Sequence, residues 1–356
     1  MRYRNVPVMA LFLGLALFVL CETHSLDAKS TSKNTPIADY NASEFEIIRA
    51  AADSWISSGK QINISTKELF SRLTDGKPGN VPFILSVREV TELPDVYTKG
   101  HIFGAVNIPW RVVFKKNNLS KLPKDMQIVV YSYNGHIGGQ VSALLNILGY
   151  DAMNLKWGMT SWTPDKEVAP GRYDESRDCK AYRIETNINE PTERPGLLIQ
   201  ENSIYQDKFE IIRAAADSWL SSCKPPNISS GNLFNKLNDT KLHNIPFILS
   251  VREINDYTKG HIFGAVNIPW RVVFKKNNLS KLPKDKQIVV YGNNGQTASQ
   301  VTALLNALGY KAINLLWGIT SWTFNKNIAP DRYSESEDCM DYYFVQGARP
   351  APEVPF

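Results

Sequence analysis

The sequence predicts an α/β protein built from two tandem domains, each a parallel sheet with helices on both faces. Residues 100–131 recur at 260–291 with a single change, Met126 in the first copy against Lys286 in the second. In both copies, apolar runs of strand length alternate with helical patterns, which favours parallel strands joined by helices. The chain has 356 residues, 43% of them hydrophobic, which is enough for two cores of ordinary size.

The repeat also predicts the domain boundaries. The stretch FEIIRAAADSW at 45–55 returns at 209–219, so the repeating unit is about a whole domain long. The segment between the copies is rich in proline and charge and lacks an apolar period, as expected of a linker. We expect a signal segment at 1–28, a first domain at 41–185, a linker at 186–204, a second domain at 205–345 and a Pro-rich tail at 346–356.

Capping patterns predict the first two helices of each unit. Ser43 and Ser65 each stand three residues before a glutamate at the start of an apolar pattern, which is typical of helix N-termini. Gly59 is placed to end the first helix. The predicted strands of the first unit are 82–87, 105–108, 127–131 and 152–155, and an amphipathic helix is expected to start near Gln140 and another near Gln300.

The N-terminus resembles an export signal. Arg2 and Arg4 precede an apolar run at 8–20, which is too short to cross a bilayer comfortably. Two kinds of processing stay open: cleavage after the small-residue site that ends at Ala28, or lipidation at Cys21. We therefore expect an exported protein, periplasmic or extracellular, which is attached to a membrane only if Cys21 is lipidated.

The charge pattern excludes some function classes. Forty basic and 35 acidic residues give a formal net charge of +5 and are scattered along the chain. Nucleic-acid binding is not predicted, because no long basic block is interleaved with aromatic residues. The histidines and cysteines do not show metal-ligand spacing, so neither a metal nor a cofactor is expected.

A motif at 97–109, YTKGHIFGAVNIP, is repeated at 257–269 and resembles the signature of the rhodanese (sulfurtransferase) family. The family usually has proline where Phe103 stands. The strand before the motif keeps the family's arginine, as Arg88 and Arg252, but serine replaces the aspartate two residues earlier. A later tryptophan–glycine pair is also present in both copies, as Trp157-Gly158 and Trp317-Gly318.

The resemblance implies a site in the loop after the central strand of each sheet. In the family, the first residue of this loop is a cysteine that accepts sulfane sulfur as a persulfide and passes it to cyanide or to another thiol. Backbone N–H groups of such a loop and of the following helix attract anions. The first loop comprises Ser132, Tyr133, Asn134, Gly135, His136, Ile137 and Gly138, and the second comprises Gly292, Asn293, Asn294, Gly295, Gln296, Thr297 and Ala298.

Neither loop begins with cysteine, since Ser132 and Gly292 stand at the position of the family nucleophile. A serine oxygen cannot form a persulfide, and glycine has no side chain. We therefore predict no catalytic residue and a protein that binds a small oxyanion, a sulfur compound or a protein partner at its loops. The alternatives are a sulfurtransferase that uses another thiol, an interaction scaffold, and a Ser132–His136 nucleophile–base pair, which lacks an orienting third group.

The remaining candidates have two interpretations each. Arg88 and Arg252 could support a bound anion, or could bind backbone carbonyls near the strand ends. Cys179 and Cys339 occupy matching positions beyond the last strand, next to aspartates that oppose thiol ionisation. A disulfide between these two, or from one of them to Cys223, is predicted, with the pairing left open. His101 and His261 are expected to be buried structural residues.

Overall fold

The computed structural model describes residues 42–89, 96–191, 207–239 and 245–347. The described residues all belong to one unit, Ile37–Phe356, which contains both repeats. The expected signal segment, Cys21 and nearly all of the Pro-rich tail lie outside the described residues. No described helix is both long and apolar enough to span a membrane.

The first repeat forms a five-stranded parallel sheet, as predicted. Its strand order is β1-β5-β4-β2-β3, so β4 is central. β1 was not predicted, because two residues are too few to give an apolar run. The bounds are β1 (Asn63–Ile64), β2 (Phe83–Ser86), β3 (Val106–Asn107), β4 (Ile128–Tyr131) and β5 (Ala152–Leu155).

Helices cover both faces of this sheet. Alternate residues of β4 belong to different hydrophobic clusters: Ile128 and Val130 pack with α5, and Val129 and Tyr131 pack with α2 and α6. The prediction of an N-cap at Ser65 is confirmed, since its hydroxyl accepts the Glu68 N–H at 3.2 Å. The helices are α1 (Ala42–Ser57), α2 (Thr66–Thr74), α3 (Val96–Lys99), α4 (Lys116–Leu119), α5 (His136–Ile147), α6 (Met159–Trp162) and α7 (Glu175–Asp178), with 3-10 turns η1 (Pro78–Asn80) and η2 (Trp110–Val112).

The second repeat has the same architecture, with strand order β10-β8-β11-β12-β7 and all pairs parallel. Its strands are β7 (Asn227–Ile228), β8 (Phe247–Ser250), β10 (Val266–Asn267), β11 (Gln287–Tyr291) and β12 (Lys311–Leu315). Its helices are α8 (Lys208–Leu220), α9 (Ser230–Leu237), α10 (Ile254–Lys259), α11 (Lys276–Leu279), α12 (Gln296–Ala307) and α13 (Glu335–Asp338), with turns η4 (Trp270–Val272) and η5 (Gly318–Ser321).

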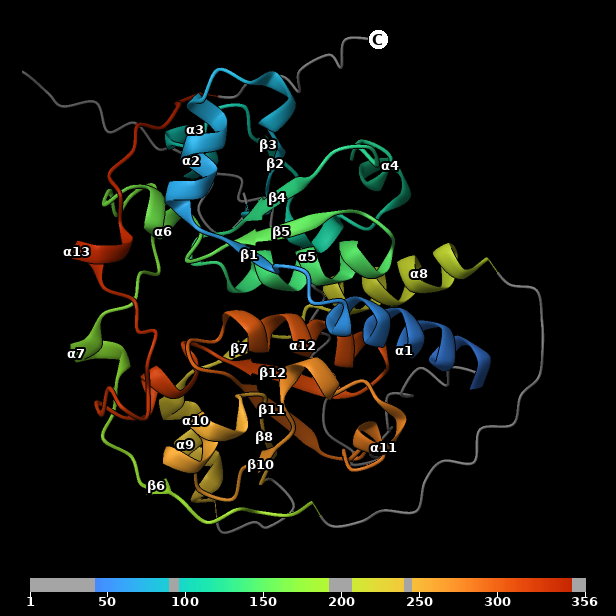
Figure 1. Ribbon diagram of the computed structural model, residues 1–356, viewed down its shortest axis with the longest axis vertical. Coiled ribbons are helices and arrows are strands. Elements are labelled where there is room, and N and C mark those ends of the chain that lie inside the picture. Colours follow the sequence, from blue (N-terminus) through green and yellow to red (C-terminus); the bar gives the residue numbers. More distant parts are fainter. Residues whose placement is uncertain (1–41, 90–95, 192–206, 240–244, 348–356) are drawn as a thin grey trace, which may run out of the picture. The chain divides into compact units, whose positions relative to one another are not determined.

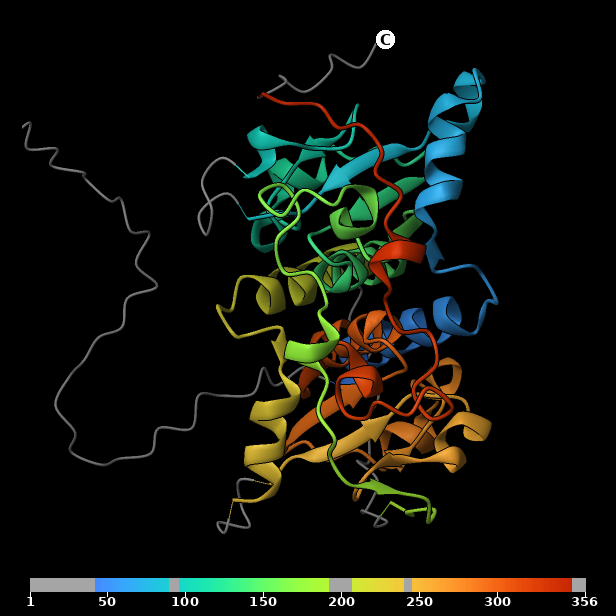
Figure 2. The ribbon, with the colours of Figure 1, turned by 90° about the vertical axis from the view of Figure 1, so that its left-hand side faces the viewer.

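The two repeats share one core. Helices α5 and α12 lie side by side between the two sheets (Figures 1 and 2). Buried residues of both helices belong to a single hydrophobic cluster, which extends from Ile48 in α1 to Ala312 in β12. The apolar faces of the repeats therefore bury each other.

The first helix of each repeat packs on the other repeat. Arg49 in α1 donates a hydrogen bond to the Phe274 carbonyl at 3.0 Å. The equivalent Arg213 in α8 donates to the Phe114 carbonyl at 2.9 Å. α1 also contacts η4 of the second repeat, and α8 contacts η2 of the first. Figure 1 shows α8 next to α5, and the Trp219 ring N–H of α8 donates to the Gln140 side chain of α5 at 3.2 Å.

The C-terminal segment of each repeat is exchanged in the same way. β6 (Ile184–Glu185) pairs antiparallel with β9 (His261–Ile262) of the second repeat. In return, Val345 forms a β-bridge with His101, and Tyr342 stacks on Phe70 with ring centroids 3.8 Å apart. Both ends of each repeat thus contact the other repeat, while the first helix also packs on the central helix of its own repeat.

These contacts predict that the two repeats stay associated when the chain is cut between them. We expect a chain cut at a protease site inserted between residues 192 and 206 to elute from a sizing column as one species at micromolar concentration. Its thermal midpoint should rise with protein concentration, because folding then includes an association step. Separation of the fragments into two folded species would contradict the exchange.

Candidate functional site

The candidate loops lie at the carboxyl ends of the central strands β4 and β11. Ser132 follows β4 directly, and Gly292 follows β11. Each loop turns into the next helix through a left-handed glycine, Gly135 with φ 86° and Gly295 with φ 84°. This conformation favours glycine, which explains why both repeats have it there.

The helices after the loops start one turn earlier than predicted, so the expected starts near Gln140 and Gln300 are wrong. The consecutive Gly138 and Gly139 disfavour a helix by propensity. The structure explains them by close packing: a Cβ at Gly138 would lie 3.3 Å from the Ser132 nitrogen, and one at Gly139 would meet Ser299 of the other repeat.

The Ser132 hydroxyl fills the backbone cradle of the first loop. Its oxygen accepts the N–H groups of Gly135 at 3.1 Å and of Gly138 at 3.2 Å. The N–H groups that would attract an anion therefore bind the side chain of the loop itself.

In the second loop, the matching position has no side chain, but it has room for one. A Cβ at Gly292 would have its nearest neighbours, the Ala298 nitrogen and Cβ, at 3.7 Å. This is ordinary van der Waals contact, so the absence of a side chain is not forced by packing.

The two loops interlock. The Nε2 atom of His136 lies 3.2 Å from the Asn294 carbonyl oxygen of the second loop. In the opposite direction, Gln296 donates to the Asn134 carbonyl oxygen at 3.0 Å, and Gln296 also accepts a hydrogen bond from Asn154. His136 and Gln296 occupy equivalent positions in the two loops. Each repeat therefore inserts the side chain at this position into the loop of the other repeat.

The interlock argues against the Ser132–His136 pair considered from the sequence. The His136 ring is fully buried and contacts Asn134 and Asn294. The Ser132 oxygen instead lies between the N–H groups of Gly135 and Gly138. The ring is therefore directed into the second loop and is not bonded to the serine.

Burial lowers the pKa of His136 from 6.5 to about 4, although its contact with the Asn294 carbonyl opposes the shift. Because the unfolded chain takes up this proton and the folded chain does not, we expect stability to fall between pH 6.5 and about 4. The contribution of His136 to this loss is about 3 kcal/mol.

His136→Gln, which introduces the residue of the second repeat, should remove this part of the pH dependence. The measurement is the free energy of unfolding at pH 7 and at pH 4.5, for wild type and variant. An equal acid-induced loss in both proteins would contradict a buried neutral His136.

Both candidate arginines bind backbone carbonyls near the strand ends, which is the second of the two predicted roles. Arg88 donates to the carbonyls of Val168 at 3.1 Å and Gly100 at 2.7 Å. Arg252 donates to the Gly260 carbonyl at 2.8 Å and to the Asn293 side chain at 2.7 Å. These contacts use the guanidinium groups to hold loops together.

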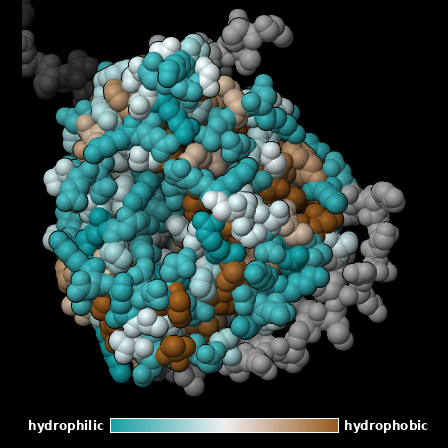
Figure 3. Space-filling view, viewed as in Figure 1, coloured by the Kyte–Doolittle hydropathy of each residue, from teal (hydrophilic) through white to brown (hydrophobic). Residues whose placement is uncertain are grey.

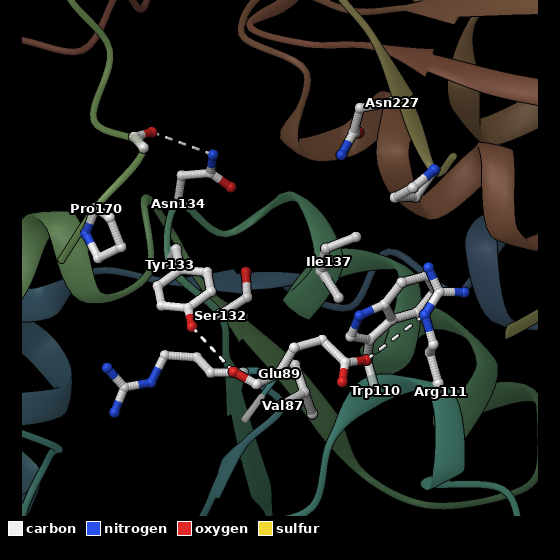
Figure 4. A pocket seen from close by; sticks show the side chains of 13 residues that line it. Val87, Glu89, Trp110, Arg111, Ser132, Tyr133, Asn134, Ile137, Pro170 and Asn227 are labelled. Atoms are coloured by element: carbon white, nitrogen blue, oxygen red, sulfur yellow. Dashed lines mark hydrogen bonds and ion pairs between the residues drawn. The ribbon is translucent and has the colours of Figure 1, made fainter. Parts of the chain in front are cut away.

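A pocket opens beside each loop. The first pocket, about 360 Å³, contains Ser132 at its floor, and the second, about 210 Å³, contains Gly292. The first is lined by Val87, Arg88, Glu89, Trp110, Arg111, Ser132, Tyr133, Asn134, Ile137, Pro170, Gly171, Pro226 and Asn227 (Figure 4). The second is lined by Asn63, Lys156, Val251, Arg252, Glu253, Trp270, Gly292, Asn293, Asn294, Gln296, Thr297 and Asp331.

The predicted disulfides of Cys179 and Cys339, with each other or with Cys223, are wrong, since both are free thiols, whereas Cys223 is disulfide-bonded. Cys179 is buried against a layer of aromatic rings to which both repeats contribute, including Trp157 and Trp317. Cys339 is half-buried, and this burial raises the pKa of its thiol. Neither lines a loop pocket. Within the described segments, no three His, Cys, Asp or Glu side chains cluster as metal ligands.

A model of the rhodanese-like domain matches residues 65–165 and 231–325, which together make up more than half of the chain. The chain belongs to the rhodanese-like family. The two matches include both central strands and both loops, so the tandem rhodanese-like architecture predicted from the repeat is confirmed.

Three similar proteins cover parts of this rhodanese-like chain. YrkF of Bacillus subtilis, provisionally named a sulfur carrier protein, is 35% identical over 77 residues, which are 21% of this chain and 40% of YrkF. MoeZ of Mycobacterium tuberculosis is 29% identical over 142 residues, 40% of this chain and 33% of MoeZ. A sulfurtransferase of Allochromatium vinosum is 29% identical over 96 residues, 27% of this chain and 85% of that protein. The chain thus spans less than half the length of YrkF and MoeZ.

Two solved structures are also similar. A rhodanese-like domain protein of Staphylococcus aureus has 28% identity and a TM-score of 0.24, and the match covers 28% of this chain and 88% of the other. A thiosulfate sulfurtransferase of Pseudomonas aeruginosa has 16% identity and a TM-score of 0.27, and the match covers 86% of this chain and 49% of the other. The rhodanese-like assignment rests on the family match and not on these scores.

Several residues of the first pocket were not predicted from the sequence. Trp110 and Arg111 follow the rhodanese-like motif directly, and their place beside it was a usable signal. Pro226 and Asn227 come from the other repeat, at the entry to β7. Sequence alone gave no indication of that contribution.

Proposed function

We propose that this rhodanese-like protein binds a small molecule in the first pocket and does not transfer sulfur. The observation that supports this is the position of the Ser132 hydroxyl, which holds the two N–H groups of the loop. In a sulfurtransferase these groups would stabilise a thiolate or persulfide. The serine oxygen keeps the hydrogen bonds to the two N–H groups, but it cannot form a persulfide.

The other thiols are poor substitutes for the missing nucleophile. Cys179 is only 2% exposed, so a donor molecule has no access to its sulfur. Burial raises the pKa of Cys339, which lowers its thiolate fraction. Both observations support a non-catalytic role.

The size of the first pocket and the one face shown in Figure 3 support ligand binding more than a scaffold role. On the face shown in Figure 3, hydrophobic residues form small groups surrounded by hydrophilic ones. A scaffold for a stable protein complex usually offers a broader apolar patch. The first pocket, by contrast, is within the size range of small-molecule sites.

The test is an assay of thiocyanate formation from thiosulfate and cyanide, with and without a thiol reductant. We expect no turnover from the purified chain. Turnover that disappears in Cys339→Ser would overturn the proposal and support a sulfurtransferase with another thiol. Turnover that persists in that variant would also overturn it.

We also propose that the protein acts outside the cytoplasm, because residues 1–20 have the charge and apolar pattern of an export signal. The mass of the mature protein isolated from its natural source tests this. A mature chain that retains residues 1–28 without a lipid at Cys21 would contradict it.

A further inference from the structure

We infer that the two pockets have diverged to bind different ligands, and that the first takes an uncharged molecule with an aromatic ring. This inference rests on the proposed function, because it names the ligand class of the same site. It differs from the oxyanion considered from the sequence.

The two repeats differ at several of the positions that line the pockets. Residues 100–131 and 260–291 differ at only one position, Met126 against Lys286. Immediately afterwards, at the pocket walls, the residues change in character. Tyr133, Ile137 and Gly171 of the first pocket correspond to Asn293, Thr297 and Asp331 of the second.

The walls of the first pocket are aromatic and aliphatic. Figure 4 shows Tyr133 and Pro170 on one side and Ile137 and Trp110 on the other, with the Ser132 hydroxyl directed into the space between Tyr133 and Ile137. Rings and aliphatic side chains arranged in this way favour a flat apolar group.

The aromatic walls are held in place. The Tyr133 hydroxyl donates to the Glu89 carbonyl oxygen at 3.2 Å, which fixes its ring. The Arg111 guanidinium lies 4.1 Å from the centre of the Trp110 ring and donates to the Leu220 carbonyl of α8. A preorganised wall of this kind loses little entropy when a ligand binds.

Both cationic side chains of the first pocket, Arg88 and Arg111, are already engaged by the protein itself, which disfavours an anion. Arg111 lies 3.7 Å from the Glu89 carboxylate, and Arg88 is bonded to carbonyls outside the pocket. The Ser132 oxygen already accepts two N–H groups, so its own hydrogen is left to donate. A hydrogen-bond acceptor on a neutral ring suits this floor.

The second pocket is smaller and polar. Lys156 forms an ion pair with Asp331 at 2.6 Å, and Asn294 also donates to Asp331. Thr297 replaces the aliphatic wall of the first pocket. The same fold therefore presents two chemically different cavities.

The experiment measures binding of indole and benzamide, and of sodium thiosulfate and sodium sulfate, to the full chain by calorimetry. We expect at least one of the aromatic probes to bind, and neither anion to compete with it. The variant Tyr133→Asn/Ile137→Thr, which copies the second pocket, should weaken aromatic binding by about tenfold or more, because apolar contact is lost.

The matched control is Asn293→Tyr/Thr297→Ile, which alters only the second pocket and should leave the affinity of the first unchanged. Thermal midpoints of both variants show whether they are folded. Aromatic binding that is insensitive to the first-pocket variant, or no aromatic binding, would overturn the inference. Tight thiosulfate binding without thiocyanate formation would overturn it and leave the non-catalytic function intact, whereas thiocyanate formation would overturn that function itself.

Discussion

Ser132→Cys is expected to give the protein the ability to accept sulfane sulfur. The new sulfur would take the place of an oxygen that receives the N–H groups of Gly135 and Gly138. Such donors at the start of a helix stabilise a thiolate. If they lower the thiol pKa by about one unit, the thiolate fraction near neutral pH rises about tenfold. Mass spectrometry after thiosulfate treatment should then show one added sulfur at position 132.

Two controls make this result specific. Gly292→Cys places a thiol in the second loop, where a Cβ has room, and should also accept sulfur. Ser120→Cys places a thiol on the surface away from either cradle and should not. If Ser132→Cys takes up no more sulfur than Ser120→Cys, the first loop has lost more than its nucleophile.

The strands and the site loops could be predicted because their sequence signals are local. A central strand such as β4 is buried on both faces, so it reads as an unbroken apolar run. The loops follow such runs directly. The early start of α5 could not be predicted, because helix propensity counts against Gly138 and Gly139, and only tertiary contacts explain these glycines.

The contacts between the ends of each repeat and the other repeat could not be predicted, for a different reason. Helices α1 and α8 share the sequence FEIIRAAADSW, so each offers the same contacts to either repeat. Sequence therefore cannot distinguish packing within a repeat from packing across repeats. The disulfide prediction failed for a related reason, since the aromatic layer around Cys179 is assembled from both repeats.

Gly158→Ala is expected to cause the largest loss of stability among single substitutions near the first loop. Gly158 has φ 56°, which a residue with a side chain adopts only with strain. A Cβ there would also overlap the Ser132 carbonyl oxygen and would lie 2.7 Å from the Gly135 nitrogen. These are backbone atoms of the loop itself, so a flexible side chain cannot move aside. We expect a loss of about 3 kcal/mol or more in the free energy of unfolding.

Gly149→Ala separates the strain from the overlap. Gly149 has φ 90°, but a Cβ there would meet nothing within 4 Å. Its alanine variant should lose only about 1 to 2 kcal/mol in denaturant unfolding, from backbone strain alone. The difference between the two variants measures how firmly the tryptophan–glycine turn is packed on the first loop, because the backbone N–H of Met159 also donates to the Ser132 carbonyl at 2.9 Å. Equal losses in the free energy of unfolding would show that the first loop can shift to accept the added Cβ. The N–H groups around Ser132 would then be held less rigidly than the structure indicates.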